Sequence, residues 1–400
     1  MQVRRLVGAL FLLTIALMVG CASLHSSLSR TRSPMTIAEF DAMLSDALQT
    51  TPGRRQRIAW NFLEEVKWRG GAPLSDSSAV LFLVEYEQPL YVMSLITKMK
   101  ALPLKRIPDT NIQYLKLDVP PDANFEYSFN TSDAHFFVDP MNKQPLSWRK
   151  LSNFSMPGWK PAELIEPIPQ APRGKLDTLL VESKSLGYER WVYIYLPPGY
   201  NPEREIPYPF LLSGDGRSTL VGGKLDIILD NLLFLGKIEP LIGVMVTTDM
   251  ARRNMEYQTQ PEWREFIVSE LLPVLRERYP LSEDPKETLV MGISFGGRMA
   301  IDMAWRYPDI FGMLGVFSPA LHNGGEMLSA NYSRCYKLPN KVFSCMGNER
   351  YNTPLYYQWL EVLEKRGVEV HTFEGNGGHS WSYWSIELPK MLEICFPKRF

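Results

Sequence analysis

From residue 173 onward the chain alternates short apolar segments with amphipathic ones, and this alternation restricts its fold more than any other feature. The apolar segments predict strands at 190–196, 210–212, 241–247, 288–291, 313–317, 341–346 and 369–373. The amphipathic segments predict helices at 224–235, 263–278, 297–307, 353–366 and 381–394. Apolar strands separated by helices indicate an α/β fold with a mostly parallel, doubly wound sheet. The ligand site of such a sheet lies at the carboxyl ends of its strands.

The part of the chain before residue 156 has a different pattern. Thr36 and Glu39 form a capping box that begins a helix ending near residue 48, and a second helix is expected over 54–68. Apolar and polar residues then alternate in short runs, as in Phe-Glu-Tyr-Ser-Phe at 125–129. Short alternating strands separated by turn residues predict a β-sandwich behind two leading helices.

A proline-rich segment separates the two patterns. Five prolines lie between residues 156 and 172, where they hold the chain extended and interrupt helices and central strands. We therefore place a linker at 156–172, a sandwich domain at 36–155 and an α/β domain at 173–400. With 45% hydrophobic and 22% charged residues, the composition excludes a mostly disordered or fibrous protein.

The first residues of the chain predict export. Arg4 and Arg5 precede an uncharged apolar run that ends at Gly20. This run covers only about 22 Å as a helix, which is too short for a hydrocarbon core of roughly 30 Å. Residues 1–20 are therefore expected to be a signal peptide.

The end of this apolar run predicts lipid attachment. Met18-Val19-Gly20-Cys21 resembles a bacterial lipobox, in which the cysteine is lipidated and becomes the first mature residue. We expect Cys21 to anchor the protein in the bacterial envelope, at the outer membrane and facing the periplasm, with residues 21–35 as a tether. A plain secretory signal or an uncleaved anchor is the alternative.

The charge and cysteine content exclude other partners. The net charge of −1 gives no general attraction to nucleic acid. No CxxC pair or HExxH motif is present, so the sequence predicts neither a metal site nor a cofactor. Beyond the lipobox, Cys335, Cys345 and Cys395 allow one disulfide, which the sequence leaves open together with the oligomeric state.

The most specific motif is Gly292-Ile293-Ser294-Phe295-Gly296-Gly297, which follows an expected strand and begins a helix. Glycines two residues before and after the serine allow a tight turn without Cβ clashes, so that the hydroxyl projects at a helix N-terminus. This arrangement is the nucleophile elbow of the α/β-hydrolase fold. We expect Ser294 to be a nucleophile, with a structural turn serine as the alternative.

A serine nucleophile requires a base, which in this fold follows an acid along the chain. His379 comes after a glycine-rich segment and directly before the last expected helix, so it is the expected base. Glu349 follows the expected strand at 341–346 and is the expected acid, which would orient the imidazole. The alternatives are a loop histidine bonded to solvent and an exposed glutamate paired with Arg350.

Acyl transfer also requires donors for the developing oxyanion. The N–H of Phe295, directly after the nucleophile, is one expected donor. Gly214-Asp215-Gly216-Arg217 follows the expected strand at 210–212 and offers a second backbone N–H, at Gly216 or Arg217. Ordinary turn formation explains these glycines equally well.

Several motifs of the α/β domain resemble bacterial esterases of the esterase D type, and among them the enterochelin esterase group. They include Arg253-x-x-Glu256, the serine motif, Tyr307-Pro308-x-x-Phe311-Gly312 and Gly377-Gly378-His379-x-Trp381-x-x-Trp384. An early-set β-sandwich often precedes such esterases, which fits the first domain. The resemblance implies a serine esterase that acts on a small-molecule ester, with a siderophore ester as the substrate.

Residues near the expected site carry the remaining predictions. We expect Arg217, Arg253, Glu256, Arg298 and His322 to bind the substrate. Several arginines around one pocket would suit an anionic ester such as a ferric catecholate. Their alternative role is in ordinary surface or ion-pair contacts.

Departures from the enterochelin esterase pattern leave the substrate open. Ile293 stands where this group more often has glutamine, and Ser318-Pro319-Ala320-Leu321 replaces its serine- and aromatic-rich pocket segment. An acetyl or feruloyl esterase acting on polysaccharide is therefore the alternative substrate class. Two other classes are a non-catalytic binding protein on a hydrolase scaffold and an acyltransferase.

Overall fold

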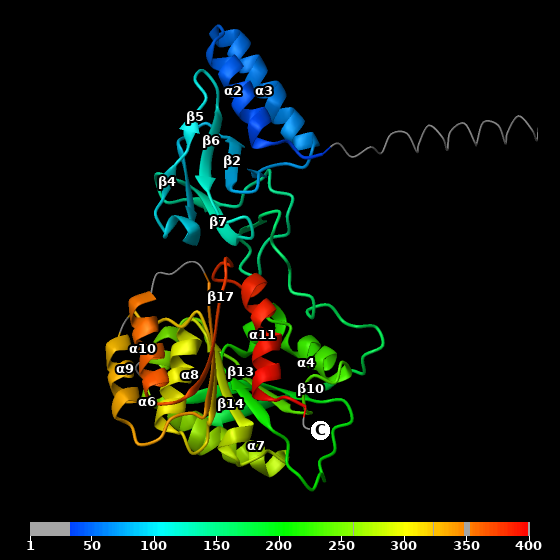
Figure 1. Ribbon diagram of the computed structural model, residues 1–400, viewed down its shortest axis with the longest axis vertical. Coiled ribbons are helices and arrows are strands. Elements are labelled where there is room, and N and C mark those ends of the chain that lie inside the picture. The colour runs from blue at the N-terminus through cyan, green and yellow to red at the C-terminus, as the bar shows by residue number, and fades with distance from the viewer. Residues whose placement is uncertain (1–32, 259, 323, 348–352, 399–400) are drawn as a thin grey trace, which may run out of the picture.

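The computed structural model describes residues 33–398 except 259, 323 and 348–352 (Figure 1). The expected lipidation site, Cys21, and the expected catalytic acid, Glu349, both lie outside these residues. Among the helices of the described part, none combines the length and the apolar character needed to cross a bilayer.

The sandwich domain begins with the two expected helices, α2 (Ile37–Leu48) and α3 (Pro52–Trp68). The capping box is confirmed, because the Glu39 N–H donates to Thr36 Oγ1 at 3.1 Å and the Thr36 N–H donates to Glu39 Oε2 at 2.7 Å. Two sheets follow. One contains β1 (Leu74–Ser75), β2 (Ala79–Glu85), β6 (Ile112–Asp118) and β5 (Lys105–Arg106) in that order. The other contains β4 (Leu102–Pro103), β3 (Leu90–Ser94), β7 (Asn124–Thr131) and β8 (Phe136–Phe137), with β9 (Ser152–Ser155) also paired to β7.

Strand β2 explains why these layers stay together. Its alternate residues enter two separate cores: Leu81 and Leu83 pack under the helices, whereas Val80 and Phe82 face the second sheet. The strand is therefore apolar throughout instead of alternating with polar residues, as expected for a strand that is covered on both faces. The result is three layers, consisting of helices, sheet and sheet.

The α/β domain contains an eight-stranded sheet in the order β10-β11-β13-β12-β14-β15-β16-β17. The strands are β10 (Lys175–Ser183), β11 (Tyr188–Leu196), β12 (Phe210–Ser213), β13 (Ile242–Val246), β14 (Thr288–Ile293), β15 (Met313–Phe317), β16 (Lys341–Met346) and β17 (Glu369–Glu374). The six strands from β12 to β17 pair in parallel, and β10 and β11 add an antiparallel edge. The predicted doubly wound, mostly parallel sheet is therefore confirmed.

Helices cover both faces of this sheet (Figure 1). Helices α4 (Leu225–Phe234) and α11 (Trp381–Cys395) contribute to the core on one face. The other face is covered by α5 (Arg253–Gln258), α6 (Pro261–Glu265), α7 (Leu272–Arg278), α8 (Phe295–Arg306), α9 (Gly325–Arg334) and α10 (Thr353–Lys365). A buried Asn231 on α4 fastens the proline-rich segment, since its Nδ2 donates to the carbonyls of Leu164 and Glu166 at 2.9 and 2.8 Å.

Four details of the α/β domain differ from the expectation. The edge strand β10 and helices α5 and α9 were not predicted. β10 exposes Leu176 and Leu180 at the sheet edge, so its apolar residues do not form the continuous run of a buried strand. The single helix expected at 263–278 is divided by a π-helical segment, Phe266–Leu271, just before Pro273, which lacks the N–H needed to continue the α pattern. The disulfide that the sequence left open does not form among the described cysteines, because Cys335, Cys345 and Cys395 are all free.

Candidate active site

Ser294 occupies the sharp turn between β14 and α8. Its backbone has φ 57° and ψ −121°, a conformation that non-glycine residues adopt only when the surroundings impose it. Two hydrogen bonds from the neighbouring chain hold the turn: the Ser294 N–H donates to the Phe317 carbonyl at 2.9 Å, and the Ala320 N–H donates to the Ser294 carbonyl at 2.9 Å. The end of β15 and the segment after it thus fix the serine at the carboxyl edge of the sheet.

Glycine is required before this turn and is closely packed after it. A Cβ at Gly292 would lie 2.1 Å from the Gly296 carbonyl oxygen, which is far inside contact distance. A Cβ at Gly297 would lie 3.1 Å from the Pro319 side chain. The spacing in the sequence motif therefore reflects direct backbone crowding at the elbow.

A second turn, at Asp215, lies beside the elbow. Asp215 has φ 53°, and its N–H donates to the Tyr257 hydroxyl at 2.9 Å. Its carboxylate accepts from Arg253 Nε at 2.6 Å and Nη2 at 2.5 Å, and the same Nη2 donates to the Ile293 carbonyl at 3.2 Å. Burial lowers the pKa of Arg253, but the Asp215 carboxylate outweighs this effect and gives a net rise. Arg253 therefore joins the Asp215 turn to the residue that precedes Ser294.

His379 lies in the loop between β17 and α11, which we name the histidine loop (residues 375–380). The edge of its ring meets Trp384 at 4.9 Å between centroids, with an interplanar angle of 79°. Trp384 is itself fixed, because its Nε1 donates to Ser318 Oγ at 3.1 Å. The Nδ1 atom of His379 is buried. The histidine ring is therefore packed against α11 instead of being free in solvent.

Ser294 and His379 line one cavity of about 350 Å³ that both domains enclose. The sandwich domain contributes Glu126, Trp148 and Arg149 to it. The α/β domain contributes Asp215, Ser218, Met250, Arg253, Ile293, Ser294, His379, Ser380, Trp381 and Trp384. Ser218 Oγ accepts hydrogen bonds from Trp381 Nε1 at 2.8 Å and from Trp148 Nε1 at 3.2 Å, which places tryptophans of both domains beside each other.

The two expected oxyanion positions lie on the two turns. Phe295 is the first residue of α8, so its N–H has no acceptor within that helix. Gly216 directly follows the Asp215 turn, where an added Cβ would lie 2.4 Å from the Met245 carbonyl oxygen. Both residues are therefore next to groups that line the cavity.

Of the five residues expected to bind substrate, only Arg253 lines this cavity. Glu256 is buried and accepts a hydrogen bond from Arg190 at 2.7 Å, so it connects α5 to β11 instead. Arg217 is exposed and Arg298 is buried. His322 packs its ring against Phe295 at 5.5 Å.

The sequence predicts a sandwich domain beside the mouth of the site, but it did not identify the residues that this domain brings into the cavity. Trp148 and Arg149 lie in a loop with no recognisable motif, and no pattern in the sequence connects them with Ser294. Trp381 and Trp384 were noted only as part of a resemblance, although their spacing after His379 places both indoles beside the cavity.

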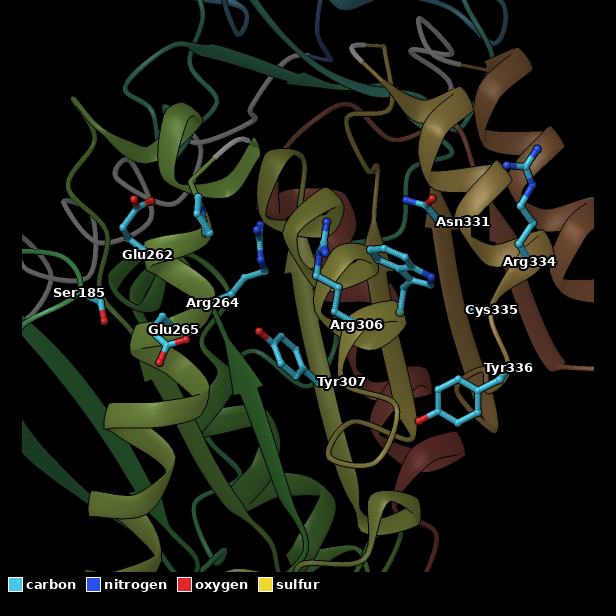
Figure 2. A pocket seen from close by; sticks show the side chains of 12 residues that line it. Ser185, Glu262, Arg264, Glu265, Arg306, Tyr307, Asn331, Arg334, Cys335 and Tyr336 are labelled. Carbon is cyan, nitrogen blue, oxygen red and sulfur yellow. The ribbon is translucent and has the colours of Figure 1, made fainter.

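A larger cavity of about 1000 Å³ lies elsewhere on the α/β domain (Figure 2). The residues described around it include Arg264, Trp305 and Arg306 but neither Ser294 nor His379. Arg264 and Arg306 both form ion pairs with Asp302, at 3.1 and 2.9 Å. This cavity therefore holds paired charges, and neither of the two expected catalytic residues is among the described residues that line it.

The family model described as "Putative esterase" matches residues 183–394, which is more than half of the chain. The chain belongs to this esterase family. The matched part of the esterase begins at the end of β10 and ends one residue before the last residue of α11. It contains both Ser294 and His379.

Two curated relatives of the chain are named as esterases. The endo-1,4-beta-xylanase/feruloyl esterase of Xylanibacter ruminicola is 26% identical over 290 residues, which cover 69% of this chain and 39% of that protein. The iron(III) enterobactin esterase of Escherichia coli is 27% identical over 204 residues, which cover 47% of this chain and 48% of that protein. The chain thus spans less than half the length of these two relatives.

The fold of the esterase is similar to that of solved enterobactin esterases. The structure of the Shigella flexneri protein, obtained in the presence of enterobactin, aligns with a TM-score of 0.66 at 19% identity. The alignment covers 81% of this chain and 94% of that chain. Because 81% exceeds the share that the α/β domain alone could supply, the likeness extends into the sandwich domain.

We expect Gly292→Ala to disable the elbow, because its Cβ would collide with the Gly296 carbonyl. Hydrolysis of p-nitrophenyl acetate should fall by roughly 100-fold or more, the scale expected when a reacting group is displaced by about 1 Å. Gly53→Ala is the matched control, since nothing lies within 4 Å of its added Cβ. Wild-type turnover in Gly292→Ala would show that the elbow geometry does not govern activity.

Proposed function

We propose that this esterase hydrolyses a carboxylic ester through an acyl-enzyme on Ser294, with His379 as general base and Glu349 as the acid that orients it. The observation that carries the proposal is that Ser294, on a strained turn, and His379 line the same cavity at the carboxyl edge of the sheet. A serine hydroxyl is a weak nucleophile at neutral pH, so a neighbouring base is needed.

The chemistry follows from this arrangement. Ser294 Oγ attacks the ester carbonyl while His379 accepts the hydroxyl proton. The resulting oxyanion accepts hydrogen bonds from the Phe295 N–H and from a backbone N–H at Gly216 or Arg217. His379 then donates the proton to the leaving alcohol, and a water molecule releases the acid by the same steps in reverse order.

The surroundings of the histidine loop support Glu349 as the acid. Strand β16 ends at Met346, whose carbonyl accepts from the Gly375 N–H at 3.3 Å at the start of the histidine loop. Glu349 follows three residues later in the sequence, directly after the end of the strand that bonds to the histidine loop. Glu374 is the other nearby carboxylate in the sequence, and it accepts from the Tyr357 hydroxyl at 2.5 Å.

The cavity favours a substrate that carries an aromatic ring. Three indoles, those of Trp148, Trp381 and Trp384, line it and offer flat apolar faces. An enterobactin-type siderophore ester is the first candidate, because the fold shared with enterobactin esterases includes both cavity-forming domains.

A feruloyl-type ester is the second candidate, and the charge balance of the cavity favours it. The two arginines that line the cavity are each paired with a carboxylate: Arg149 with Glu126 and Arg253 with Asp215. The walls thus carry no excess of positive charge to attract an anionic ester. The name of the Xylanibacter ruminicola relative includes this activity.

The proposed residues can be tested with matched pairs of variants. Ser294→Ala and His379→Ala should each lower kcat for p-nitrophenyl acetate by roughly 10³-fold or more, because each removes a member of a unit that acts together. Glu349→Gln should also lower kcat, through loss of a negative partner for the imidazolium. The controls Ser333→Ala, His371→Ala and Glu374→Gln should keep wild-type rates. Full activity in Ser294→Ala would refute the mechanism.

Trp148→Ala should separate aromatic from aliphatic substrates. We expect kcat/KM for methyl ferulate and for a catecholate siderophore ester to fall by roughly 5-fold, because stacking on an aromatic ring contributes about 1 kcal/mol. Hydrolysis of an aliphatic acetate ester should change less than about twofold. Trp60→Ala, which removes an exposed indole from α3, is the control. Equal losses on both substrate types would argue against an aromatic subsite. The wild-type protein separately decides between the two candidate substrates, according to whether kcat/KM is higher for methyl ferulate or for the siderophore ester.

We also propose that Cys21 anchors the esterase in the bacterial outer membrane, on the periplasmic side. The support is the lipobox-like Met18-Val19-Gly20-Cys21 after a short apolar run. Expression in a bacterium grown with labelled palmitate should label the wild type but not Cys21→Ala, and membrane fractionation should place the label in the outer membrane. Equal labelling of both proteins would contradict the proposal.

A further inference from the structure

The histidine loop has few side chains with which to fix its own shape. Three of its six residues are Gly375, Gly377 and Gly378. On one side the loop backbone lies against Tyr383 of α11, since a Cβ added at Gly377 would be 2.2 Å from that side chain. The side of the loop that faces away from Tyr383 must therefore be held by contacts with another part of the molecule.

The sandwich domain provides this support through β7. Asn124, the first residue of β7, forms an isolated parallel bridge with Gly377, and its N–H donates to the Asn376 carbonyl at 3.1 Å. A Cβ at Gly378 would lie 3.1 Å from the Asn124 carbonyl oxygen. In Figure 1 the connection between β17 and α11 reaches up to the lower end of the sandwich domain, near β7. The histidine loop thus forms one β-bridge and one backbone hydrogen bond with the other domain.

Side chains reinforce this backbone contact. Asn376 Nδ2 donates to Asp122 Oδ1 at 2.7 Å, and Ser382 Oγ of α11 donates to Asn124 Oδ1. Asn124 is almost fully buried, and its Nδ2 donates to Ser155 Oγ of β9 at 2.9 Å. One asparagine therefore connects two strands of the sandwich domain with the segments on both sides of His379.

A third contact reaches His379 directly. Arg149 Nη2 donates to the His379 carbonyl at 3.3 Å. The guanidinium is in turn held by an ion pair with Glu126, a buried residue of β7. The histidine loop is therefore bonded to β7 at two places. Asn376 bonds to β7 directly, and His379 bonds to Arg149, which β7 holds through Glu126.

We propose that the sandwich domain positions the catalytic histidine, with Asn124 and Asp122 as positioning residues for His379. This inference rests on the proposed function, in which His379 is the general base. A general base must lie within hydrogen-bond reach of the proton that it takes, and a misplacement of about 1 Å can cost roughly 100-fold in rate. The contact between the domains accordingly affects kcat in addition to holding the two domains together.

The test uses the full-length protein and p-nitrophenyl acetate. Asp122→Ala should lower kcat by roughly 3- to 10-fold with little change in KM, because the base is displaced while the cavity keeps its walls. Asp122→Asn should restore most of the rate, since its amide oxygen can still accept from Asn376. Asp118→Ala is the control: it removes another exposed aspartate of the sandwich domain that lies at the end of β6.

Asn124→Ala should have a larger effect on kcat, roughly 10- to 100-fold, because it removes bonds to both β9 and α11. Asn376→Ala combined with Asp122→Ala should be no worse than either single variant, since both remove the same hydrogen bond. Asp122 is exposed, so its variants test the proposal even if Asn124→Ala does not fold.

The outcomes separate this inference from the proposed function. If Ser294→Ala and His379→Ala are inactive while Asp122→Ala and Asn124→Ala keep the wild-type kcat, the contact only docks the domains and the positioning inference is overturned. If Ser294→Ala retains full activity, the proposed function itself fails. A kcat loss that Asp122→Asn rescues, with KM and the thermal midpoint of Asp122→Ala near those of Asp118→Ala, supports the inference.

Discussion

The left-handed backbone at Ser294 is the constraint on which the site depends. A serine with φ 57° has an unfavourable conformation, so the turn persists only because neighbouring groups leave no alternative. Gly292 lets the helix start pass close to the strand. Phe317 at the end of β15 supplies an acceptor to the turn, and Ala320 after β15 supplies a donor. Arg253 then joins the elbow to the Asp215 turn. The expected nucleophile and both expected oxyanion donors therefore lie on turns that belong to one hydrogen-bonded unit.

The second feature that shapes the site is the contact between the domains. The carboxyl edge of the parallel sheet is where catalytic loops gather, and in this protein the sandwich domain covers that edge. Its Trp148 and Arg149 complete the cavity wall, while β7 bonds to the histidine loop. The likeness to the solved Shigella flexneri structure, which covers 81% of this chain, includes this domain as well.

Much of this architecture could be predicted from the sequence, and the failures have physical causes. Buried parallel strands such as β15 and β16 are continuous apolar runs, so their bounds were predicted as the structure has them. The edge strand β10 is half exposed and was missed. The Ser294 elbow was predictable because its glycines are a local requirement. The role of Trp148 and Arg149 could not be predicted, because it arises from contacts between residues that are distant in the sequence. Glu256 was misjudged for the same reason: its motif near Arg253 reflects an ion pair with β11 and not a place in the cavity.

The most direct test of the account is covalent labelling with a fluorophosphonate, followed by peptide mapping. An activated serine at the elbow should be modified once per molecule, on the peptide that contains Ser294, and His379→Ala should abolish the labelling because the base is lost. Stoichiometric labelling at Ser294 in the wild type is the predicted result. Labelling at a different serine, or undiminished labelling of Ser294 in His379→Ala, would contradict the assignment of nucleophile and base.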